Sequence, residues 1–521
     1  MPAGKPHSGG RPAIPGKLAP GMRLPRELVA ESQRARLGIA LIELVDAQGF
    51  ADTSLADLTA RAHVARAAFY EHFGSMEGCF AAAYDDHLAR AAGALVAAYN
   101  APGMEHGERA HAALSALAAF AQVWPAAARV CLGDVLTVAE GTVEAREQLA
   151  EGAHALLHSA LGPHGAHTTR APALVTATIG AIRRALYVHL RERPARELPA
   201  LVEPLLDWVR VYGEEPPAGA LGEALSVAGD VRAGGASGEG MGTDGLATDD
   251  GPKERILAAV LKLAAGKEGE SISLADIAAG AGVSFGTFYK HFRTSQEALL
   301  GACEAVHERQ IEQAREAYFT VLDGSADDEM LATAARLPAD GEAAPEVTDA
   351  RGGEQGTAPV WVVGDEAAAR EPGTRAGESG VAPVWALGIA RALGAYLSAA
   401  AADPPATRTM LLGSLGLGRL GLDFLERRAQ ALKQLLGPGL RAHPDLPAAT
   451  GDMLAGAILE LLHDHALRGQ LERLPELHEQ LTYIVLAPLL AAHEGRAQAE
   501  HVLETPHAST ALATKRARAR R

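Results

Sequence analysis

The sequence is poor in the residues that build sheets and disulfide frameworks. Aromatic residues make up 4% of the 521 positions, β-branched runs are scarce and alanine is frequent throughout. Because alanine is the strongest helix former, this composition disfavours a β-sandwich or barrel and predicts an all-α fold. The three cysteines, Cys79, Cys131 and Cys303, are widely spaced and form no C-x-x-C pair, which fits a reducing compartment.

Long apolar runs are also missing. No stretch of about 18 uninterrupted apolar residues occurs, which predicts that no segment spans a membrane. The N-terminus is rich in proline, glycine and basic residues without an apolar core, so it lacks the pattern of a secretory signal. These absences favour a cytoplasmic location.

Charge is unevenly distributed along the chain. Residues 213–251 carry a net charge of −7 and residues 323–382 a net charge of −9, which together account for the formal net charge of −16. Both segments are poor in large apolar side chains, so we expect them to be disordered. The ends are basic, and the last seven residues, KRARARR, form either a solvated tail or a source of non-specific DNA affinity. The overall acidity therefore does not exclude a nucleic-acid partner.

An internal repeat is the strongest signal in the chain. Residues 54–73 read SLADLTARAHVARAAFYEHF and residues 273–292 read SLADIAAGAGVSFGTFYKHF, with eleven identities at a constant offset of 219. A second correspondence, LPAL at 198–201 with LPEL at 474–477, has an offset of 276. The difference of 57 residues is close to the length of the acidic segment 323–382. The sequence therefore predicts a tandem duplication of one helical unit, with an insertion in the second copy.

Each repeat has the pattern of two short helices joined by a tight turn. Ser54 and Ser273 are suitable N-cap residues, each followed three residues later by aspartate. Gly282 suits a turn that requires positive φ, and His63 takes the same place in the first copy at some cost. Helix, short turn and helix form the helix-turn-helix unit, whose second helix fits the major groove of DNA.

These motifs resemble the DNA-binding domain of the tetracycline-repressor (TetR) family of transcriptional regulators. The family pattern ends in A-G-V-S-x-x-[TA]-[FL]-Y-x-H-F; the second copy matches it almost throughout, and the first departs at several positions. The lysine usual near the start of the following helix is replaced by Met76 and Gln296, with Arg293 as a possible substitute. The resemblance implies two tandem TetR-like units, each a three-helix helix-turn-helix head followed by a helical effector-binding and dimerisation domain.

The resemblance and the composition together divide the chain into seven segments. The predicted segments are a basic disordered arm at 1–30, a helix-turn-helix domain at 31–91, a helical domain at 92–212, an acidic linker at 213–251, a second helix-turn-helix domain at 252–310, a helical domain at 311–493 with the disordered insertion 323–382, and a basic tail at 494–521.

The resemblance also implies which residues meet DNA. Hydroxyl, phenol and imidazole groups on the second helix are expected at phosphates, which set register without reading sequence. Phe285, Gly286 and Lys290 are the expected base-edge residues of the second copy, and Arg66 is the candidate guanine reader of the first. The full set of predicted contacts is Ser54, Arg66, Tyr70, His72, Ser273, Ser284, Phe285, Gly286, Thr287, Tyr289, Lys290 and His291.

Other roles for these residues stay open. Partial packing also explains Tyr70 and Tyr289, a solvated surface position explains Arg66, and helix capping explains His72 and His291. Ala65 and Ala68 replace two hydroxyls of the second copy, so the first head is the weaker match.

The helical domains are expected to hold an effector pocket and a dimerisation face. Because one chain carries both heads, we hypothesise an intramolecular pseudo-dimer, with a homodimer as the alternative. Small residues such as Gly180 and Gly456 suit close helix packing in that face. The helices expected to form it are 171–193, 197–212, 447–469 and 474–491.

The predicted function is a transcriptional regulator of the repressor type, which binds a double-stranded DNA operator and releases it when an unknown small-molecule effector binds. Because the heads differ, an operator with unlike half-sites is expected. No catalytic motif, cofactor pattern or complete metal-ligand set is present, so no enzyme activity, cofactor or metal is expected. The alternative is a helical ligand-binding or interaction protein whose first head no longer reads DNA.

Overall fold

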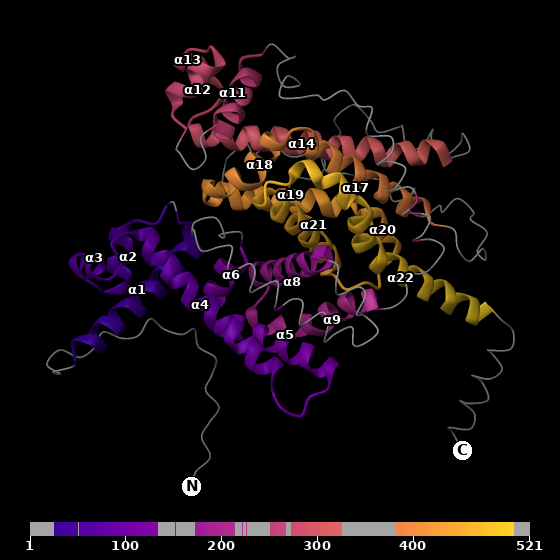
Figure 1. The fold of residues 1–521 in the computed structure, drawn as a ribbon, viewed down its shortest axis with the longest axis horizontal. Coiled ribbons are helices and arrows are strands. Elements are labelled where there is room, and N and C mark those ends of the chain that lie inside the picture. Colours follow the sequence, from indigo (N-terminus) through magenta and orange to yellow (C-terminus); the bar gives the residue numbers. More distant parts are fainter. Residues whose placement is uncertain are drawn as a thin grey trace, which may run out of the picture.

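A computed structural model of the chain describes residues 25–50, 52–133, 152, 172–213, 221, 224, 226, 251–266, 272–325 and 382–504. This part of the chain is built from helices and contains no strand (Figure 1). The all-α prediction is confirmed.

The first unit begins with a three-helix head and continues into a helical body. Two short 3₁₀ helices, η3 (Ala195–Leu201) and η4 (Val211–Gly213), flank the last helix of the body. The helices are α1 (Arg26–Gln48), α2 (Leu55–Ala62), α3 (Arg66–Phe73), α4 (Met76–Tyr99), α5 (His106–Val123), α6 (Pro125–Leu132), α8 (Pro172–Glu192) and α9 (Val202–Arg210).

The second unit repeats this arrangement. Its second, third and fourth helices begin 219 residues after those of the first unit, so the repeat continues beyond the motif itself. The 3₁₀ helices here are η7 (Gly413–Leu417) and η8 (Leu471–Leu477). The helices are α11 (Pro252–Gly266), α12 (Leu274–Ala281), α13 (Phe285–His291), α14 (Ser295–Ser325), α17 (Val384–Ala402), α18 (Pro404–Leu412), α19 (Arg419–Leu435), α20 (Gly437–Ala442), α21 (Thr450–Leu467) and α22 (His478–Glu504).

Helices extend into the three segments that were predicted to be disordered and into the predicted basic tail. The arm 1–30 already contains the start of α1, the insertion 323–382 contains the end of α14, and the tail 494–521 contains the end of α22. These segments continue helices that are already nucleated, and their alanine, glutamate and arginine residues favour propagation. Within the linker 213–251, Leu221 and Ala224 are helical and buried in the core, so two apolar side chains suffice to anchor it there. Most of the remaining residues of these four segments lie outside the described part.

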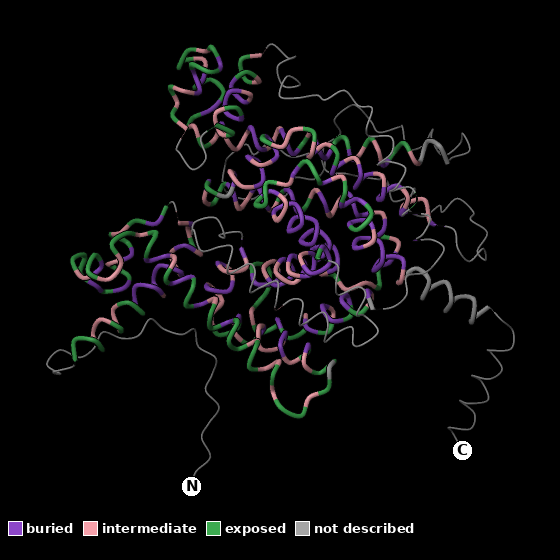
Figure 2. The backbone as a smooth tube through the Cα atoms, in the orientation of Figure 1, coloured by how far each residue is buried: buried purple, intermediate pink, exposed green. Residues whose placement is uncertain are grey.

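The bodies of the two units share one hydrophobic core, which is centred on the crossing of α8 with α21 (Figure 2). A Cβ atom added to Gly180 would meet the carbonyl oxygen of Gly456, and one added to Gly456 would meet the carbonyl oxygen of Gly180. The two backbones therefore approach too closely for any side chain at either position. At the far end of the interface the Tyr212 hydroxyl donates a 2.7 Å hydrogen bond to the carbonyl oxygen of Ile484.

Charged side chains on α8 complete this interface. Arg183 pairs with Glu460 at 2.7 Å, and Arg184 pairs with Glu426 at 2.6 Å. Arg184 also lies 3.8 Å from Asp452. These ion pairs join α8 of the first unit to α19 and α21 of the second, so electrostatic and apolar contacts hold the same two bodies together.

The two heads are attached to this core differently. The apolar residues of the second head belong to the shared core, whereas those of the first head form a separate cluster that includes Ala127 and Val130 of α6. Arg129 of α6 also forms a two-pronged ion pair with Asp46 of α1, at 2.6 and 2.7 Å. Both heads lie in the left half of Figure 1, on the same side of the shared core.

One helix among the described residues, α17, is long and apolar enough to cross a membrane by length and composition, and the bent pair α5–α6 would be a second candidate if counted as one span. Arg391 interrupts α17, and 56% of its most apolar window is buried against the rest of the protein. Its packing against α14 and η8 explains its apolar character as that of a core helix.

Candidate nucleic-acid interface

The second head forms its helix-turn-helix by local hydrogen bonds. The Ser273 hydroxyl accepts from the backbone N–H of Asp276 at 3.1 Å and so caps α12. Gly282 ends that helix in the left-handed conformation, with φ at 62° and ψ at 36°. The Ser284 hydroxyl then caps α13 by accepting from the N–H of Thr287 at 3.1 Å. Cap, left-handed turn and second cap therefore fix the angle between the two helices.

One side of α13 anchors the helix and the other is exposed. Phe288 is fully buried, whereas Phe285 and Tyr289 are 53% and 56% exposed. Gly286 and Lys290 are exposed as well. A Cβ atom on Gly286 would meet only the Ser284 hydroxyl, at an ordinary 3.7 Å, so the surface above this glycine is open. A helix with a bare glycine, an aromatic ring, a phenol and an ammonium group on one exposed face suits insertion into a groove.

The remaining predicted contacts of the second head lie around this face. The hydroxyls of Ser284 and Thr287 are 2.9 Å apart at the start of α13. His291, at the end of α13, is exposed. The structure thus brings Ser284, Phe285, Gly286, Thr287, Tyr289, Lys290 and His291 together on one short helix, with Ser273 at the start of the neighbouring helix α12.

The first head has the same turn with different local chemistry. The Ser54 hydroxyl accepts from the N–H of Asp57 at 3.1 Å and donates to its carboxylate at 2.6 Å. His63 ends α2 at φ 51° and is the single non-glycine residue with positive φ in the described part of the chain. Ala65 stands at the start of α3 and offers no side-chain cap. The helix-turn-helix therefore forms here with a strained turn residue and one cap fewer.

The exposed face of α3 centres on two residues. The Arg66 guanidinium lies 5.7 Å from the centre of the Tyr70 ring and donates to the Tyr70 hydroxyl at 3.4 Å. Tyr70 is 49% exposed. Glu71 stands where the second head has Lys290, so the first face carries a negative charge at that position. The two heads thus present different donors and charges to a common partner.

The two motif histidines differ in their surroundings. The Nε2 atom of His72 lies 2.9 Å from the side-chain oxygen of Gln33, and the residue is half-buried. His291 is exposed. The geometry therefore favours an internal role for His72, which links α3 to α1, and leaves His291 on the surface.

Two buttressing arginines were missed by the sequence analysis. Arg36 donates to the carbonyl oxygen of His63 at 3.4 Å, and Arg255 donates to the carbonyl oxygen of Ala281 at 3.3 Å. Both stand on the first helix of their head and reach the turn of the motif. They are 219 residues apart, so the repeat itself was the signal that would have identified them.

Neither a group of metal ligands nor a thiol of lowered pKa is found among the described residues. They contain no group of three or more His, Cys, Asp or Glu side chains placed to hold a metal ion. Burial raises the pKa of the Cys79, Cys131 and Cys303 thiols to about 12, which keeps them protonated and weakly nucleophilic at neutral pH.

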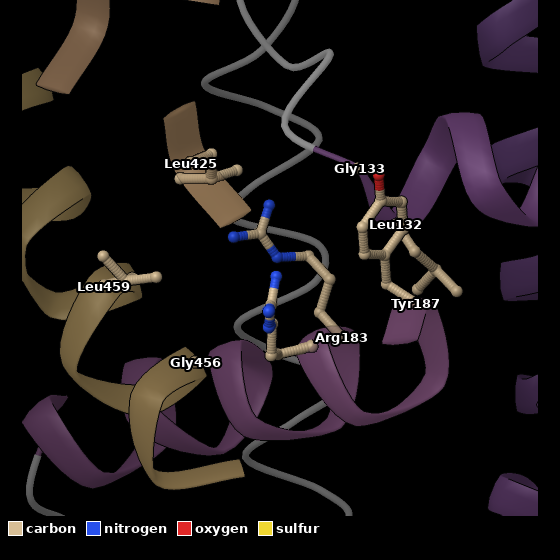
Figure 3. A pocket seen from close by; sticks show the side chains of 8 residues that line it. Leu132, Gly133, Arg183, Tyr187, Leu425, Gly456 and Leu459 are labelled. Carbon is tan, nitrogen blue, oxygen red and sulfur yellow. The ribbon is translucent and has the colours of Figure 1, made fainter. Parts of the chain in front are cut away.

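A small cleft lies where the two bodies meet. Leu425 and Leu459 lie on one side and Leu132 and Tyr187 on the other, with Arg183 between them (Figure 3). The cavity measures about 20 Å³, which is room for about one water molecule. This cleft is too small to hold an effector.

Two segments of the chain match the family described as "Bacterial regulatory proteins, tetR family", at residues 40–83 and 256–303. Each match covers the helix-turn-helix of one head and the start of the helix that follows it. No curated protein matches the chain.

Proposed function

We propose that this chain, which carries two segments that match the tetR-family DNA-binding domain, is a cytoplasmic transcriptional repressor of that family that a small-molecule effector releases from DNA. The observation that carries the proposal is that both heads keep the helix-turn-helix geometry on one side of a shared core. The seven segments predicted from the sequence remain part of this proposal, with the helix ends given above.

The two units act as a pseudo-dimer within one chain. Support comes from the crossing of α8 with α21, where Gly180 and Gly456 bring the backbones together, and from the ion pairs between Arg183 and Glu460 and between Arg184 and Glu426. A helix-turn-helix dimer places its two reading helices about one turn of DNA apart. Here one chain supplies both.

The operator has unlike half-sites. In the first head Arg66 reads a guanine and Tyr70 binds phosphate, while Ser54 contributes at the edge of the face. In the second head Phe285, Gly286 and Lys290 meet base edges. Phosphate contacts there come from Ser273, Ser284, Thr287, Tyr289 and His291.

The effector acts by shifting the population between two arrangements of the heads. It binds more tightly to an arrangement in which the two heads no longer match successive grooves, and DNA favours the other arrangement by the same coupling energy. The separate core of the first head makes it the part that changes position. Its attachment through Arg129 and Asp46 is the joint about which it moves.

The first experiment is selection of DNA sites with the purified full chain, followed by fluorescence anisotropy on the selected site over a salt series. We expect one site with unlike halves, bound about 10³-fold more tightly than random DNA, with affinity that falls as salt rises. Mass photometry should find one chain on each operator. A palindromic site with two chains bound would contradict the pseudo-dimer.

Two substitutions then test the heads separately. Arg66→Ala should weaken binding about 10- to 100-fold and relax specificity in one half-site only. Tyr289→Phe should weaken binding at the other half without changing sequence preference. Matched controls are Arg61→Ala, whose guanidinium pairs with Glu43 within the first head, and Tyr99→Phe on α4.

The same variants separate the proposal from its alternative. If Tyr289→Phe weakens binding and Arg66→Ala does not, the first head is a partner surface and does not read DNA. If neither changes binding and no site is selected, the chain is a helical interaction protein.

A further inference from the structure

A buried arginine in the second body has no partner. Arg428 on α19 is fully buried, and none of its three guanidinium nitrogens has a hydrogen-bond partner among the described residues. The guanidinium carbon lies 5.9 Å from the centre of the Phe424 ring on the same helix. An aromatic ring stabilises a cation only in part, and the described residues supply no anion for the desolvated charge of Arg428.

Two buried polar side chains of α14, His307 and Gln310, are also unsatisfied. The His307 ring meets Phe424 edge-on at 6.1 Å, and neither of its nitrogens has a partner in the described part of the protein. Gln310 donates to the Thr407 hydroxyl at 2.9 Å, but its side-chain oxygen is unpaired. All of these side chains are at least nine-tenths buried.

The charges next to His307 in this cluster are positive. Burial, followed by the positive charges of Arg428 and Arg427, lowers the pKa of His307 to about 3. His307 is therefore neutral at physiological pH and available as a hydrogen-bond donor. Arg427 is half-exposed and pairs with Glu304, so it differs from Arg428 in having its own counter-charge.

The first unit lacks the polar side chains that α14 contributes to this cluster. The offset of 219 places Leu88 and Ala91 where the second unit has His307 and Gln310. Two polar positions of α14 therefore distinguish the second unit from the first.

We propose that Arg428 is the anchor of the effector site in the second unit, and that the effector is a small organic carboxylate with an apolar body. The planar guanidinium fork matches the two oxygens of a carboxylate, and His307 supplies a further donor. The Phe424 ring faces the apolar body, and the Gln310 oxygen accepts from a hydroxyl or amide group of the ligand. The assignment of this ligand as the effector rests on the proposed function, whereas carboxylate binding itself is measurable without DNA.

The cluster is also connected to the second head. His307 and Gln310 stand on α14, the helix that directly follows α13, and Thr294 caps its start by accepting from the N–H of Glu297 at 3.0 Å. An anion that draws Arg428 and His307 together thus acts on the helix that carries the head. This links the carboxylate to the second head, relative to which the first head changes position.

The test uses the full chain with benzoate, octanoate and inorganic phosphate, and with benzamide and octanamide as neutral counterparts. At saturation, at least one carboxylate should raise Tm by about 5 °C, whereas the amides and phosphate should not. Arg428→Met should abolish this rise. Arg427→Met removes a neighbouring charge that already has a partner, so it should retain the rise.

Several outcomes would overturn the proposal. A rise that persists in Arg428→Met places the carboxylate elsewhere, and a rise with phosphate alone assigns a different anion. If no carboxylate raises Tm, the proposal fails, and the ligand-free Arg428→Met protein shows why. A lower Tm in that variant means that the chain itself supplies the counter-charge, and a higher Tm means that the charge is simply unpaired.

Operator binding is measured in parallel by anisotropy, so the two proposals fail separately. A chain that binds its operator but no carboxylate refutes only the effector site. A chain that binds carboxylates through Arg428 but selects no DNA refutes the repressor.

Discussion

The two heads have the same backbone and are stabilised by different means. In the second, Gly282 makes the turn and Ser284 caps the reading helix; in the first, His63 makes the turn and Ala65 leaves the helix uncapped. Both nevertheless fold, because the buried aromatic of the reading helix, Phe69 or Phe288, is retained. A helix-turn-helix thus tolerates the loss of a cap and a glycine as long as its core is intact, while the exposed face is free to diverge.

The bodies differ as the heads do. The core of the second head continues into the shared core, and the second body has the buried cluster of Arg428, His307 and Gln310. The first head has its own core, and the positions of α4 that correspond to the two polar residues of α14 carry Leu88 and Ala91. The first head is therefore the more loosely attached part and the second body the more polar inside, which fits a division between a moving head and a sensing body.

The largest expected difference between the units is in their response to acid. The pKa of His307 is about 3 in the folded protein against 6.5 as its ordinary value, so below pH 6.5 the unfolded state binds more protons and stability falls as the pH falls. The slope approaches about 1.4 kcal/mol per pH unit well below pH 6.5, so the loss between pH 6.5 and 4.5 is about 2.3 kcal/mol. Amide hydrogen exchange should report this loss in α14 and not in α4. His307→Leu, which introduces the residue found at position 88, should remove it; an equal loss in both helices would contradict the assignment.

The second prediction concerns how the first head is held. Arg129→Met should destabilise the attachment of α1 to α6 by about 2 kcal/mol, because it removes two charged hydrogen bonds to Asp46. Limited proteolysis should then cleave the first head faster and leave the second unchanged. Arg90→Met is the control, since its exposed pair with Asp86 contributes only about 0.3–0.5 kcal/mol. Equal protection of both heads in Arg129→Met would show that the joint lies elsewhere.

The third prediction exchanges the helix caps. Ser284→Ala should cost about 1 kcal/mol, because the N–H of Thr287 loses its acceptor, and Ala65→Ser should gain a similar amount by capping the N–H of Ala68. Urea denaturation measures both changes. A neutral Ala65→Ser would mean that the start of α3 does not accept the cap geometry of α13.

The smallest effects are expected at the turn. Gly282→Ala should cost about 1 kcal/mol, because its φ of 62° is unfavourable for a residue with a Cβ atom, and His63→Gly should gain about 0.5 kcal/mol by relieving the same strain. Thermal unfolding of the paired variants gives both values. If both variants stabilise the protein, or both destabilise it, the two turns are not equivalent.

Sequence reasoning succeeded where the determinants are local. Each motif spans only twenty residues, and the repeat shows each signal twice. The signals are the caps at Ser54 and Ser273, the glycine turn and the spacing of Phe69 and Phe288. The helices near 171–193 and 447–469 were also located, because they recur at one offset. Local patterns of this kind define elements but not the contacts between them.

The residues that were missed act across longer distances. Arg36 reaches a carbonyl 27 positions away, and His307 and Arg428, which both lie against Phe424, are 121 positions apart in the sequence. An arginine in an amphipathic helix looks solvated until the packing shows its burial. Predicted disorder failed at helix ends for a related reason, since acidic, alanine-rich residues are compatible with both a disordered tail and the continuation of a helix.

Gly180 and Gly456 hold equivalent places in two copies that are encoded separately. When two identical chains pair, one mutation alters both helices of the crossing. Here a mutation at Gly180 or Gly456 alters one helix, and the new side chain meets the unchanged carbonyl of the other. Halves joined by the same chain also meet at a fixed effective concentration, so dilution does not part them.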